Sequence, residues 1–244
     1  MLYTHIIVEG TVKEVIEFIK GTHQLNSEGR YVFSLNKCIP TPVTPDGDII
    51  DGWYDWRVEN WGVRDECDVH SECYTCIKGE TKEYNDLTWL DYDRFIEFEK
   101  RANDYDIMEG LCTISNAVSL PLKALDKIAE MYKDTDLKIT VKYHVASECI
   151  VGAIKYFKGE VTESEEFTCD EHGPEYYEYL LNEGYETTDS LMNDIEFTVK
   201  DSLTDMYDED FVNRLLKKLT EQMYSDCTNA EKAKLYYDIC IDEE

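Results

Sequence analysis

The stretch YTHIIVEGTVKEVIEFIKG, residues 3–21, places a predicted strand directly before a predicted helix. Within Tyr3–Gly10 three consecutive β-branched residues indicate a strand. Thr11 can then accept an N–H group at the start of a helix, and Glu14, three residues later, completes a capping box. Apolar residues follow at helical spacing, and Gly21 ends them. The chain therefore begins with a β-α unit.

Working outward, the same patterns continue to about residue 159. Alternating or β-branched runs predict strands, and apolar stripes with capping residues predict helices. The first two elements that follow are a strand over Tyr31–Pro40 and a short helix over Asp51–Gly62. After them come a strand from Leu111 that leads into a helix at Pro121, and a hairpin of Leu137–Val145 with Cys149–Phe157. Helices on one face of a mostly antiparallel sheet are expected, which is an α+β fold of the ferredoxin-like, split βαβ kind. The segment 79–110 is predicted to be an acidic insertion.

The composition changes at Glu160. Residues 160–244 hold 25 acidic and 6 basic side chains, whereas residues 1–159 hold 28 and 18. Apolar residues nevertheless recur at helical spacing in four segments of this tail. We therefore expect two parts, a ferredoxin-like α+β domain over 1–159 and an acidic helical region over 160–244.

The net charge limits the classes of partner. With 53 Asp and Glu against 24 Lys and Arg, the chain carries a formal charge of −29. A compact body of this length has a diameter of roughly 45 Å, and a DNA duplex that long carries about 26 phosphate charges. Direct binding to nucleic acid or to an anionic membrane is therefore not expected, and a protein with a basic nucleic-acid-binding surface is the expected partner.

The location of the protein is also predicted from composition. No run of about 18 apolar residues occurs, and the N-terminal residues lack a signal-peptide pattern. The nine cysteines are odd in number and scattered, which favours reduced thiols. We expect a cytoplasmic protein of a bacterial cell.

Three motifs stand out in the first 160 residues. The first is Phe33–Asn36 with Ile39, Pro40 and Pro42, and the second is Asn60-Trp61-Gly62. The third is Thr113–Ser119 followed by Pro121. Together they resemble the YubB-type ferredoxin-like family of phage and plasmid proteins, a domain of unknown function. Val63, Arg64 and Asp65 depart from that family's pattern. The resemblance implies the fold and an origin in a mobile element, and it brings no catalytic residues.

Four residues of zinc-ligand type follow the Asn-Trp-Gly motif at intervals of three, namely Cys67, His70, Cys73 and Cys76. Structural zinc sites usually join two close pairs that lie a dozen or more residues apart. On a strand, positions three apart point to opposite faces, so all four converge only in an irregular coil. A zinc site is one interpretation, and a cluster of buried or edge-strand cysteines is the other.

Enzymatic patterns are weak. Cys169 and His172 are spaced like a nucleophile and its base, but the sequence offers no orienting third group, and a polar surface loop is the alternative. No phosphate-binding glycine motif occurs. A hydrolase or nuclease that binds Mg²⁺ through carboxylates would need a cleft that a sequence cannot reveal. We therefore expect no enzyme and assign no catalytic residue.

The hypothesis from these observations is a phage or mobile-element protein that inhibits a host defence protein, such as a CRISPR effector or a restriction nuclease, by mimicking the charge of nucleic acid. The tail residues predicted to contact the partner are Glu163, Glu165, Glu166, Asp170, Glu171, Glu175, Glu178, Glu183, Glu186, Asp189, Asp194, Asp208, Glu209 and Asp210. Further contacts are expected from residues 80–106, and exposed aromatic anchors from Tyr84, Tyr92, Tyr105, Tyr176, Tyr177, Tyr185 and Tyr207. The alternative is a zinc-stabilised structural or regulatory protein whose acidity serves solubility only.

Overall fold

The structure is a computed structural model that describes residues 2–66, 73–77, 96, 107–115, 120–204 and 206–241. Its chain forms two compact units. The first unit comprises Met1–Glu148 and Gly152–Glu165, and the second comprises Cys149–Val151 and Glu166–Glu244. The predicted insertion at 79–110 lies outside the described residues, apart from Ile96 and the strand that begins at Ile107.

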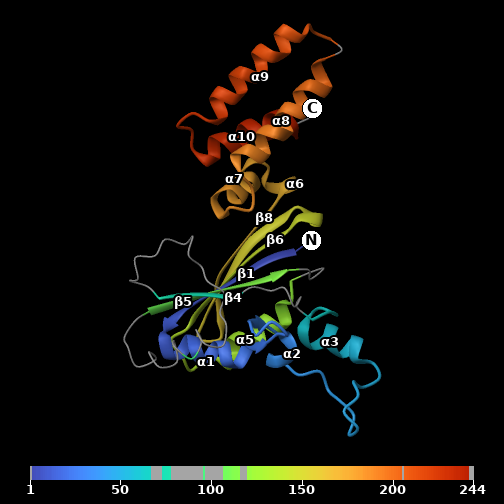
Figure 1. The fold of residues 1–244 in the computed structure, drawn as a ribbon, viewed down its shortest axis with the longest axis vertical. Coiled ribbons are helices and arrows are strands. Elements are labelled where there is room, and N and C mark those ends of the chain that lie inside the picture. The colour runs from blue at the N-terminus through green and yellow to red at the C-terminus, as the bar shows by residue number, and fades with distance from the viewer. Residues whose placement is uncertain are drawn as a thin grey trace. The chain divides into compact units, whose positions relative to one another are not determined.

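The main element of the first unit is a six-stranded sheet in the order β4-β5-β1-β6-β7-β8 (Figure 1). Its strands are β1 (Leu2–Thr11), β4 (Cys73–Ile77), β5 (Ile107–Ser115), β6 (Lys138–Val145), β7 (Ile150–Phe157) and β8 (Glu160–Thr168), the last two of which continue into the second unit. The helices are α1 (Val12–Thr22), α2 (Leu35–Cys38), α3 (Trp53–Trp61), α5 (Leu122–Met131) and the 3-10 turn η2 (Ala146–Glu148). The predicted α+β class is confirmed.

Strand β1 lies inside the sheet because it pairs along its length with two antiparallel neighbours. It pairs with β5 from Tyr3↔Ser115 to Thr11↔Ile107, and with β6 from Leu2↔Val145 to Glu9↔Lys138. On the far side of β5, β4 is also antiparallel. At the other edge, β7 and β8 are joined by Lys158 and Gly159, both with positive φ, as a two-residue hairpin turn requires.

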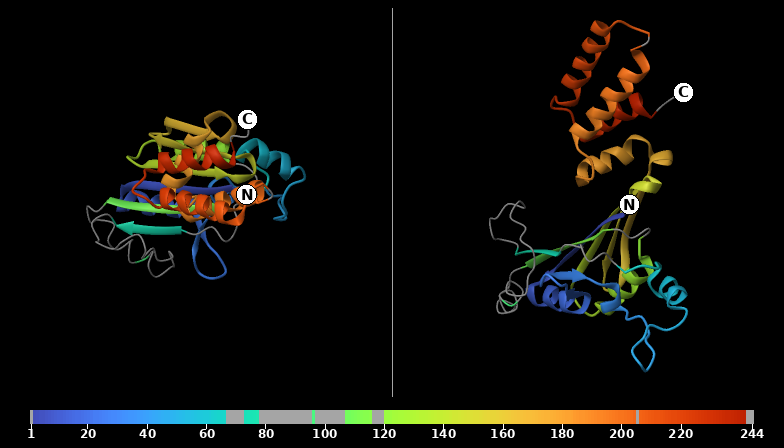
Figure 2. Two further views of the ribbon diagram at one scale, coloured as in Figure 1. Left: turned by 90° about the horizontal axis from the view of Figure 1, so that it is seen from above. Right: turned by 45° about the vertical axis from the view of Figure 1, so that its right-hand side comes forward.

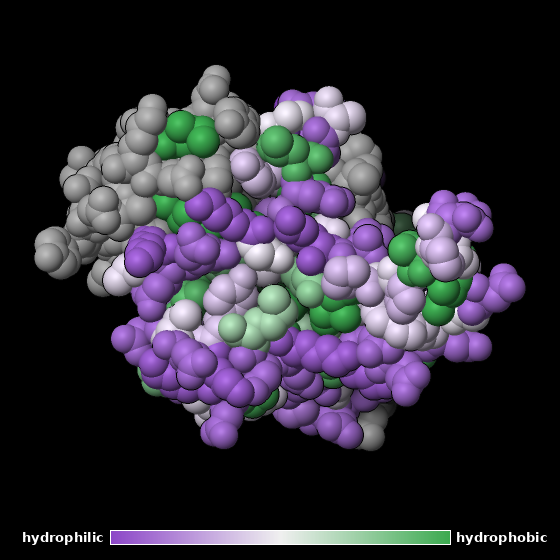
Figure 3. Space-filling view, turned by 90° about the horizontal axis from the view of Figure 1, so that it is seen from below, coloured by the Kyte–Doolittle hydropathy of each residue, from purple (hydrophilic) through white to green (hydrophobic). Residues whose placement is uncertain are grey.

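Helices α1 and α5 cover one face of this sheet (Figures 1 and 2). The apolar stripe of each helix is buried, and the rings of Phe18 and Tyr132 lie 5.1 Å apart between them. Seen from the helical side, hydrophilic side chains dominate the surface and hydrophobic ones form small groups (Figure 3). The outer helix faces are therefore solvated, as amphipathic helices require.

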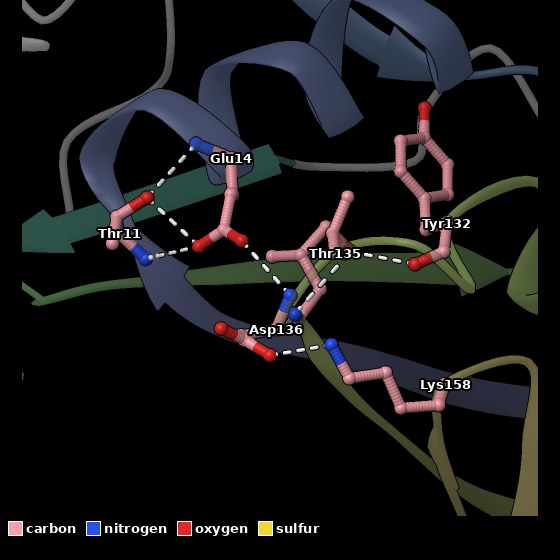
Figure 4. A network of polar contacts seen from close by, with 7 residues as sticks. Thr11, Glu14, Tyr132, Thr135, Asp136 and Lys158 are labelled. Carbon is pink, nitrogen blue, oxygen red and sulfur yellow. Dashed lines mark hydrogen bonds and ion pairs between the residues drawn. The ribbon is translucent and has the colours of Figure 1, made fainter.

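The predicted capping box of α1 is confirmed, and it is part of a larger polar network (Figure 4). The Thr11 N–H donates to the Glu14 carboxylate at 3.0 Å, and the Glu14 N–H donates to the Thr11 hydroxyl at 3.3 Å. The second Glu14 oxygen accepts the N–H of Asp136 at 2.9 Å, and the Asp136 carboxylate pairs with Lys158. One carboxylate thus ties the start of α1 to the loop before β6.

The predicted strand over Tyr31–Pro40 is wrong in extent. Only β3 (Tyr31–Phe33) is extended, and it pairs with β2 (His23–Leu25) in a separate two-stranded sheet. Helix α2 then begins, because the Ser34 hydroxyl accepts the Lys37 N–H. The carboxylate of Glu66 accepts two further N–H groups at this helix start, from Leu35 at 2.6 Å and from Asn36 at 2.8 Å. A carboxylate 31 residues away from Leu35 therefore overrides the local strand propensity.

The Asn-Trp-Gly motif forms a structural corner. Helix α3 ends at Gly62, which has φ +83° and fits closely against the start of α5. The Trp61 side chain is 0% exposed, and its indole N–H donates to the Ile39 carbonyl at 2.9 Å. Asn60 accepts a hydrogen bond from Lys127 on α5 at 2.8 Å. The motif thus fixes α3 against the rest of the first unit.

The second unit contains α6 (Cys169–His172), α7 (Pro174–Glu183), α8 (Thr188–Leu203), α9 (Glu209–Met223) and α10 (Asn229–Cys240) (Figure 2). Helix α10 packs against α7 and α8, and α9 packs against α8. Two apolar clusters hold them, one around Ile195 and Met223 and the other around Val151 and Tyr176.

The predicted helical region over 160–244 needs one correction, because its first nine residues, Glu160–Thr168, form strand β8 at the edge of the sheet. The hairpin turn at Lys158 and Gly159 aligns these residues beside β7. Residues 160–166 are exposed on both faces, so the segment shows none of the alternation that predicts a half-buried strand. Charged side chains are common on edge strands, where they prevent pairing with other chains.

Candidate functional site

The fourteen predicted contact residues all fall on the described part of β8 and the second unit. Glu163, Glu165 and Glu166 lie on β8; Asp170 and Glu171 on α6; Glu175, Glu178 and Glu183 on α7; Glu186 between α7 and α8; Asp189 and Asp194 on α8; and Asp208, Glu209 and Asp210 at the start of α9. Eleven of them are exposed, while Glu178, Glu183 and Glu186 are half-buried. These carboxylates are therefore presented from folded elements.

Some of these acids have a structural role of their own. Asp208 caps α9 and accepts the Phe211 N–H at 2.8 Å, and Glu209 and Asp210 occupy the first turn of that helix. Negative side chains at that end stabilise a helix through its dipole. Glu163 pairs with Lys155, and Asp189 accepts a hydrogen bond from the Tyr224 hydroxyl. A role in helix capping or pairing accounts for these five acids without a partner.

The remaining acids are concentrated before α9. No Lys or Arg occurs in the sequence between residues 160 and 199, whereas α9 and α10 carry five of the six basic residues of the tail. Lys217 and Lys234 form ion pairs with Glu221 and Asp238, each within one helix. The acidic side chains of residues 160–199, on β8 and on α6 to α8, therefore have no basic residue among them in the sequence.

Three of the four expected aromatic anchors that the structure describes pack against the core. Tyr176 is buried, and Tyr177 and Tyr185 are half-buried against the two apolar clusters. Burial raises the pKa of Tyr177 far above its usual range, and its hydroxyl lies 3.4 Å from the Cys169 sulfur. Of the predicted anchors in the described residues, Tyr207 is exposed. Tyr84, Tyr92 and Tyr105 lie outside the described residues.

The four predicted zinc ligands are only partly described. Cys67 and His70 lie outside the described residues, while Cys73 and Cys76 lie in β4, opposite Cys112 and Glu109 of β5. Across the part of the chain that the structure describes, no group of three or more His, Cys, Asp or Glu is arranged to hold a metal ion. Zinc binding at this segment stays a prediction.

Cys169 and His172 do not form a nucleophile–base pair in α6. The His172 Nδ1 atom accepts the backbone N–H of Thr168 at 3.0 Å, and its ring lies edge-on to Phe167. The Cys169 thiol instead meets the Tyr177 hydroxyl. Both side chains therefore stabilise the junction between β8 and α7.

His23 follows α1, and the Cys38 thiol of α2 lies 3.9 Å from the Thr22 carbonyl at the end of α1; sequence patterns missed this placement. His23 is buried between Phe18 and Phe33, its Nδ1 lies 2.8 Å from the Thr22 hydroxyl, and burial lowers its pKa to about 3. Burial raises the pKa of the Cys38 thiol to about 12. Both shifts oppose the charged thiolate and imidazolium forms that a nucleophilic pair uses.

One groove of about 420 Å³ opens between β1, β6, β7 and β8. Lys138 and Lys155 line it together with Glu9 and Glu163, and Lys155 pairs with Glu163. This mixture of opposite charges gives no preference for an anionic or a cationic ligand, so the groove does not define a site.

Comparison with known proteins gives no relative, since no protein-family model, curated protein or solved structure matches this chain. Among the residues that the structure describes, none of the helices combines the length and apolar character needed to cross a membrane.

Proposed function

We propose that the chain is a non-enzymatic inhibitor that binds the nucleic-acid-binding surface of a host defence protein, such as a CRISPR effector or a restriction nuclease. It would act in the cytoplasm of a bacterial cell and derive from a phage or another mobile element. The proposal rests on one observation: most carboxylates of β8 and of α6 to α8 are exposed on folded elements, in a segment that has no basic residue before Lys200.

The electrostatic reasoning is direct. Like charges at close spacing cost a helix a few tenths of a kcal/mol per pair, so a surface rich in them is retained at some expense of stability. Fixed rows of carboxylates attract the same basic grooves that attract phosphate rows. Association with such a groove would be fast and sensitive to salt.

We further propose that the first unit is ferredoxin-like. This proposal is supported by the strand order β4-β5-β1-β6. In it, β1 lies between β5 and β6 and is antiparallel to both, and β5 is antiparallel to β4. Helix α1 lies between β1 and β4 in the sequence. This is the order expected of a split βαβ sandwich, with β7 and β8 added beyond β6.

The test begins with affinity capture of nucleic-acid-binding proteins by the full chain from a bacterial lysate, followed by an assay in which duplex DNA competes for the captured protein. The test variant neutralises four acids of α6 to α8, as Glu171→Gln, Glu175→Gln, Glu178→Gln and Asp194→Asn. The matched control neutralises four exposed acids of the first unit, as Asp46→Asn, Asp48→Asn, Asp55→Asn and Glu59→Gln.

We expect the test variant to lose about ten-fold or more in affinity and the control to lose little, because close opposing charges dominate such contacts. Equal losses in both variants would show that only net charge matters and would reject the mimicry. Tight binding that is unchanged between about 50 and 500 mM NaCl would also reject it.

A further inference from the structure

The corner between α8 and α9 exposes an apolar surface that the second unit does not bury. Met206, Tyr207 and Phe211 are 66%, 51% and 38% exposed. The rings of Tyr207 and Phe211 are stacked, with centroids 4.7 Å apart and planes 26° apart. We define these three residues as the aromatic corner. Val212, the next residue of α9, is buried by contrast.

The stacked pair has a local role. Tyr207 immediately precedes the N-cap Asp208, and Phe211 is the third residue of α9, one position before the residue that a hydrophobic staple uses. Their contact packs the incoming chain against the first turn of the helix in a similar way. This contact uses the ring faces that touch each other. The exposed parts of both rings and of Met206 remain available to another molecule.

The charges around the corner select the kind of molecule. Residues 201–213 contain five acidic side chains and no basic one, and the nearest basic residue after them is the exposed Arg214 of α9. Asp201, Asp208, Glu209 and Asp210 are exposed. The face of an aromatic ring is itself electrostatically negative, so the corner combines π faces with carboxylates. A cation that can lie flat on a ring and donate to a carboxylate fits it best, and arginine does both.

The first unit shows that this chain supports the same pairing internally. The Arg57 guanidinium lies 4.9 Å from the ring centroid of Trp53 and 4.4 Å from that of Trp61, and Arg64 lies 5.5 Å from the ring of Tyr54 while pairing with Asp65. Among the described residues, the cation–ring contacts do not include Tyr207 or Phe211.

We infer that the aromatic corner is an anchor that receives an arginine side chain from the basic partner. The inference rests on the proposed function, which it deepens by naming the contact: the carboxylates of β8 to α8 attract the basic surface, and the corner distinguishes arginine from lysine on it. Arginine is the residue that basic nucleic-acid-binding surfaces use for stacking and for two-pronged contact with phosphate.

The test measures binding of two labelled probes, nona-arginine and nona-lysine, to the full chain by fluorescence anisotropy at about 150 mM NaCl. The variant Tyr207→Leu/Phe211→Leu keeps an apolar contact and removes the π faces. The control, Phe197→Leu, changes an aromatic residue that is 73% exposed on α8, outside the corner. Circular dichroism verifies that each variant retains its helices.

The wild-type chain is expected to prefer nona-arginine. The double variant should bind nona-arginine roughly two- to five-fold more weakly, the size of an exposed cation–π contact, with nona-lysine unchanged. An unchanged arginine preference in the double variant, or an equal loss in Phe197→Leu, would overturn the anchor. If both probes bind without any preference, the anchor fails but the charge proposal stands. If neither probe binds, the charge proposal fails as well.

Discussion

The two units of this chain are stabilised in different ways. In the first unit, polar side chains join elements far apart in the sequence: Glu14 holds the N–H of Asp136, Asp136 pairs with Lys158, and Glu66 caps α2. In the second unit, the ion pairs of Lys200, Lys217 and Lys234 each join residues four apart on one helix. Its helices are joined by apolar clusters and by a few polar contacts, such as the hydrogen bond from Tyr224 to Asp189. Ion pairs therefore connect distant elements in the first unit, and mainly neighbouring turns of one helix in the second.

The largest expected effect is the loss of unfolding free energy when a core residue of either unit is truncated. Trp61→Ala removes a fully buried indole and leaves the Ile39 carbonyl without its donor, so it should cost about 3–5 kcal/mol of unfolding free energy. Ile195→Ala in the second unit should cost about 2–5 kcal/mol. Trp53, Trp56 and Trp61 lie in the first unit, and the sequence of the second unit contains no tryptophan. Tryptophan fluorescence therefore follows the unfolding of the first unit, and circular dichroism follows the helices of both.

We expect Trp61→Ala to shift the fluorescence transition to lower denaturant concentration and Ile195→Ala to shift mainly the helical signal. Trp53 and Trp56 remain as reporters in the first variant. If each variant moved both signals together, the two units would unfold as one cooperative body and the comparison above would not describe their stability.

Sequence patterns predicted the parts of the fold that local chemistry determines. The capping box of α1, the end of α3 at Gly62 and the hairpin of β6 with β7 were predicted, and all three are present. Strand β8 was missed because the hairpin turn, rather than hydrophobic alternation, sets its position. A short-range pattern cannot show a residue such as Glu66, which caps α2 from 31 residues beyond Leu35.

The candidate site was predictable to the same extent. Sequence identifies the acids and the helices that carry them, and these helices are present. It does not show which aromatic side chains are buried and which stay exposed. Tyr176 and Tyr207 both lie among acidic residues, yet Tyr176 is buried against Val151 and Tyr207 stays exposed. That distinction depends on tertiary packing, as does the burial of His23.

Acid should weaken the first unit through His23. Its folded pKa of about 3 lies below the ordinary value of 6.5, so the unfolded chain binds a proton that the folded chain excludes. The stability contribution is complete above pH 6.5 and is lost as the pH falls from there toward 3, with a slope of up to about 1.4 kcal/mol per pH unit.

Denaturant titrations monitored by tryptophan fluorescence between pH 7 and pH 4 measure this slope. His23→Phe places a neutral ring between Phe18 and Phe33 and should flatten it, whereas His172→Gln in the second unit should leave it as in the wild type. A slope that is equally steep in His23→Phe would assign the acid sensitivity to other groups.

The two capping boxes offer a matched pair across the units. Burial opposes ionisation of Glu14, but hydrogen bonds from Asp136 and Thr11 outweigh it and lower its pKa. Glu14→Ala leaves the Thr11 cap but removes the carboxylate that accepts the Thr11 N–H and the link to Asp136, so we expect a loss of about 1–2 kcal/mol in the fluorescence-monitored transition. This contribution is present above the ordinary pKa of 4.5 and disappears as the pH falls through the lower folded value.

Glu231 makes the equivalent box with Thr228 at the start of α10, where its described hydrogen bonds are to Thr228 itself. Glu231→Ala should therefore cost less than Glu14→Ala, measured by circular dichroism at 222 nm. A cost as large as that of Glu14→Ala would mean that the long-range link to Asp136 adds no stability, and the polar ties of the first unit would then be incidental to its fold.

The smallest effect is the response to salt. Screening weakens repulsion between like charges, so raising NaCl from about 50 to 500 mM should stabilise the second unit, by a few tenths of a kcal/mol for each close acidic pair. The first unit should respond less, because several of its acids are paired with lysine or arginine. The variant with Glu171, Glu175, Glu178 and Asp194 neutralised should respond less than the wild type in the helical signal. If it responded as strongly, the repulsion would come from the whole chain rather than from α6 to α8. The acids of that segment would then not destabilise the second unit more than other acids do, and a basic partner would relieve no particular repulsion there.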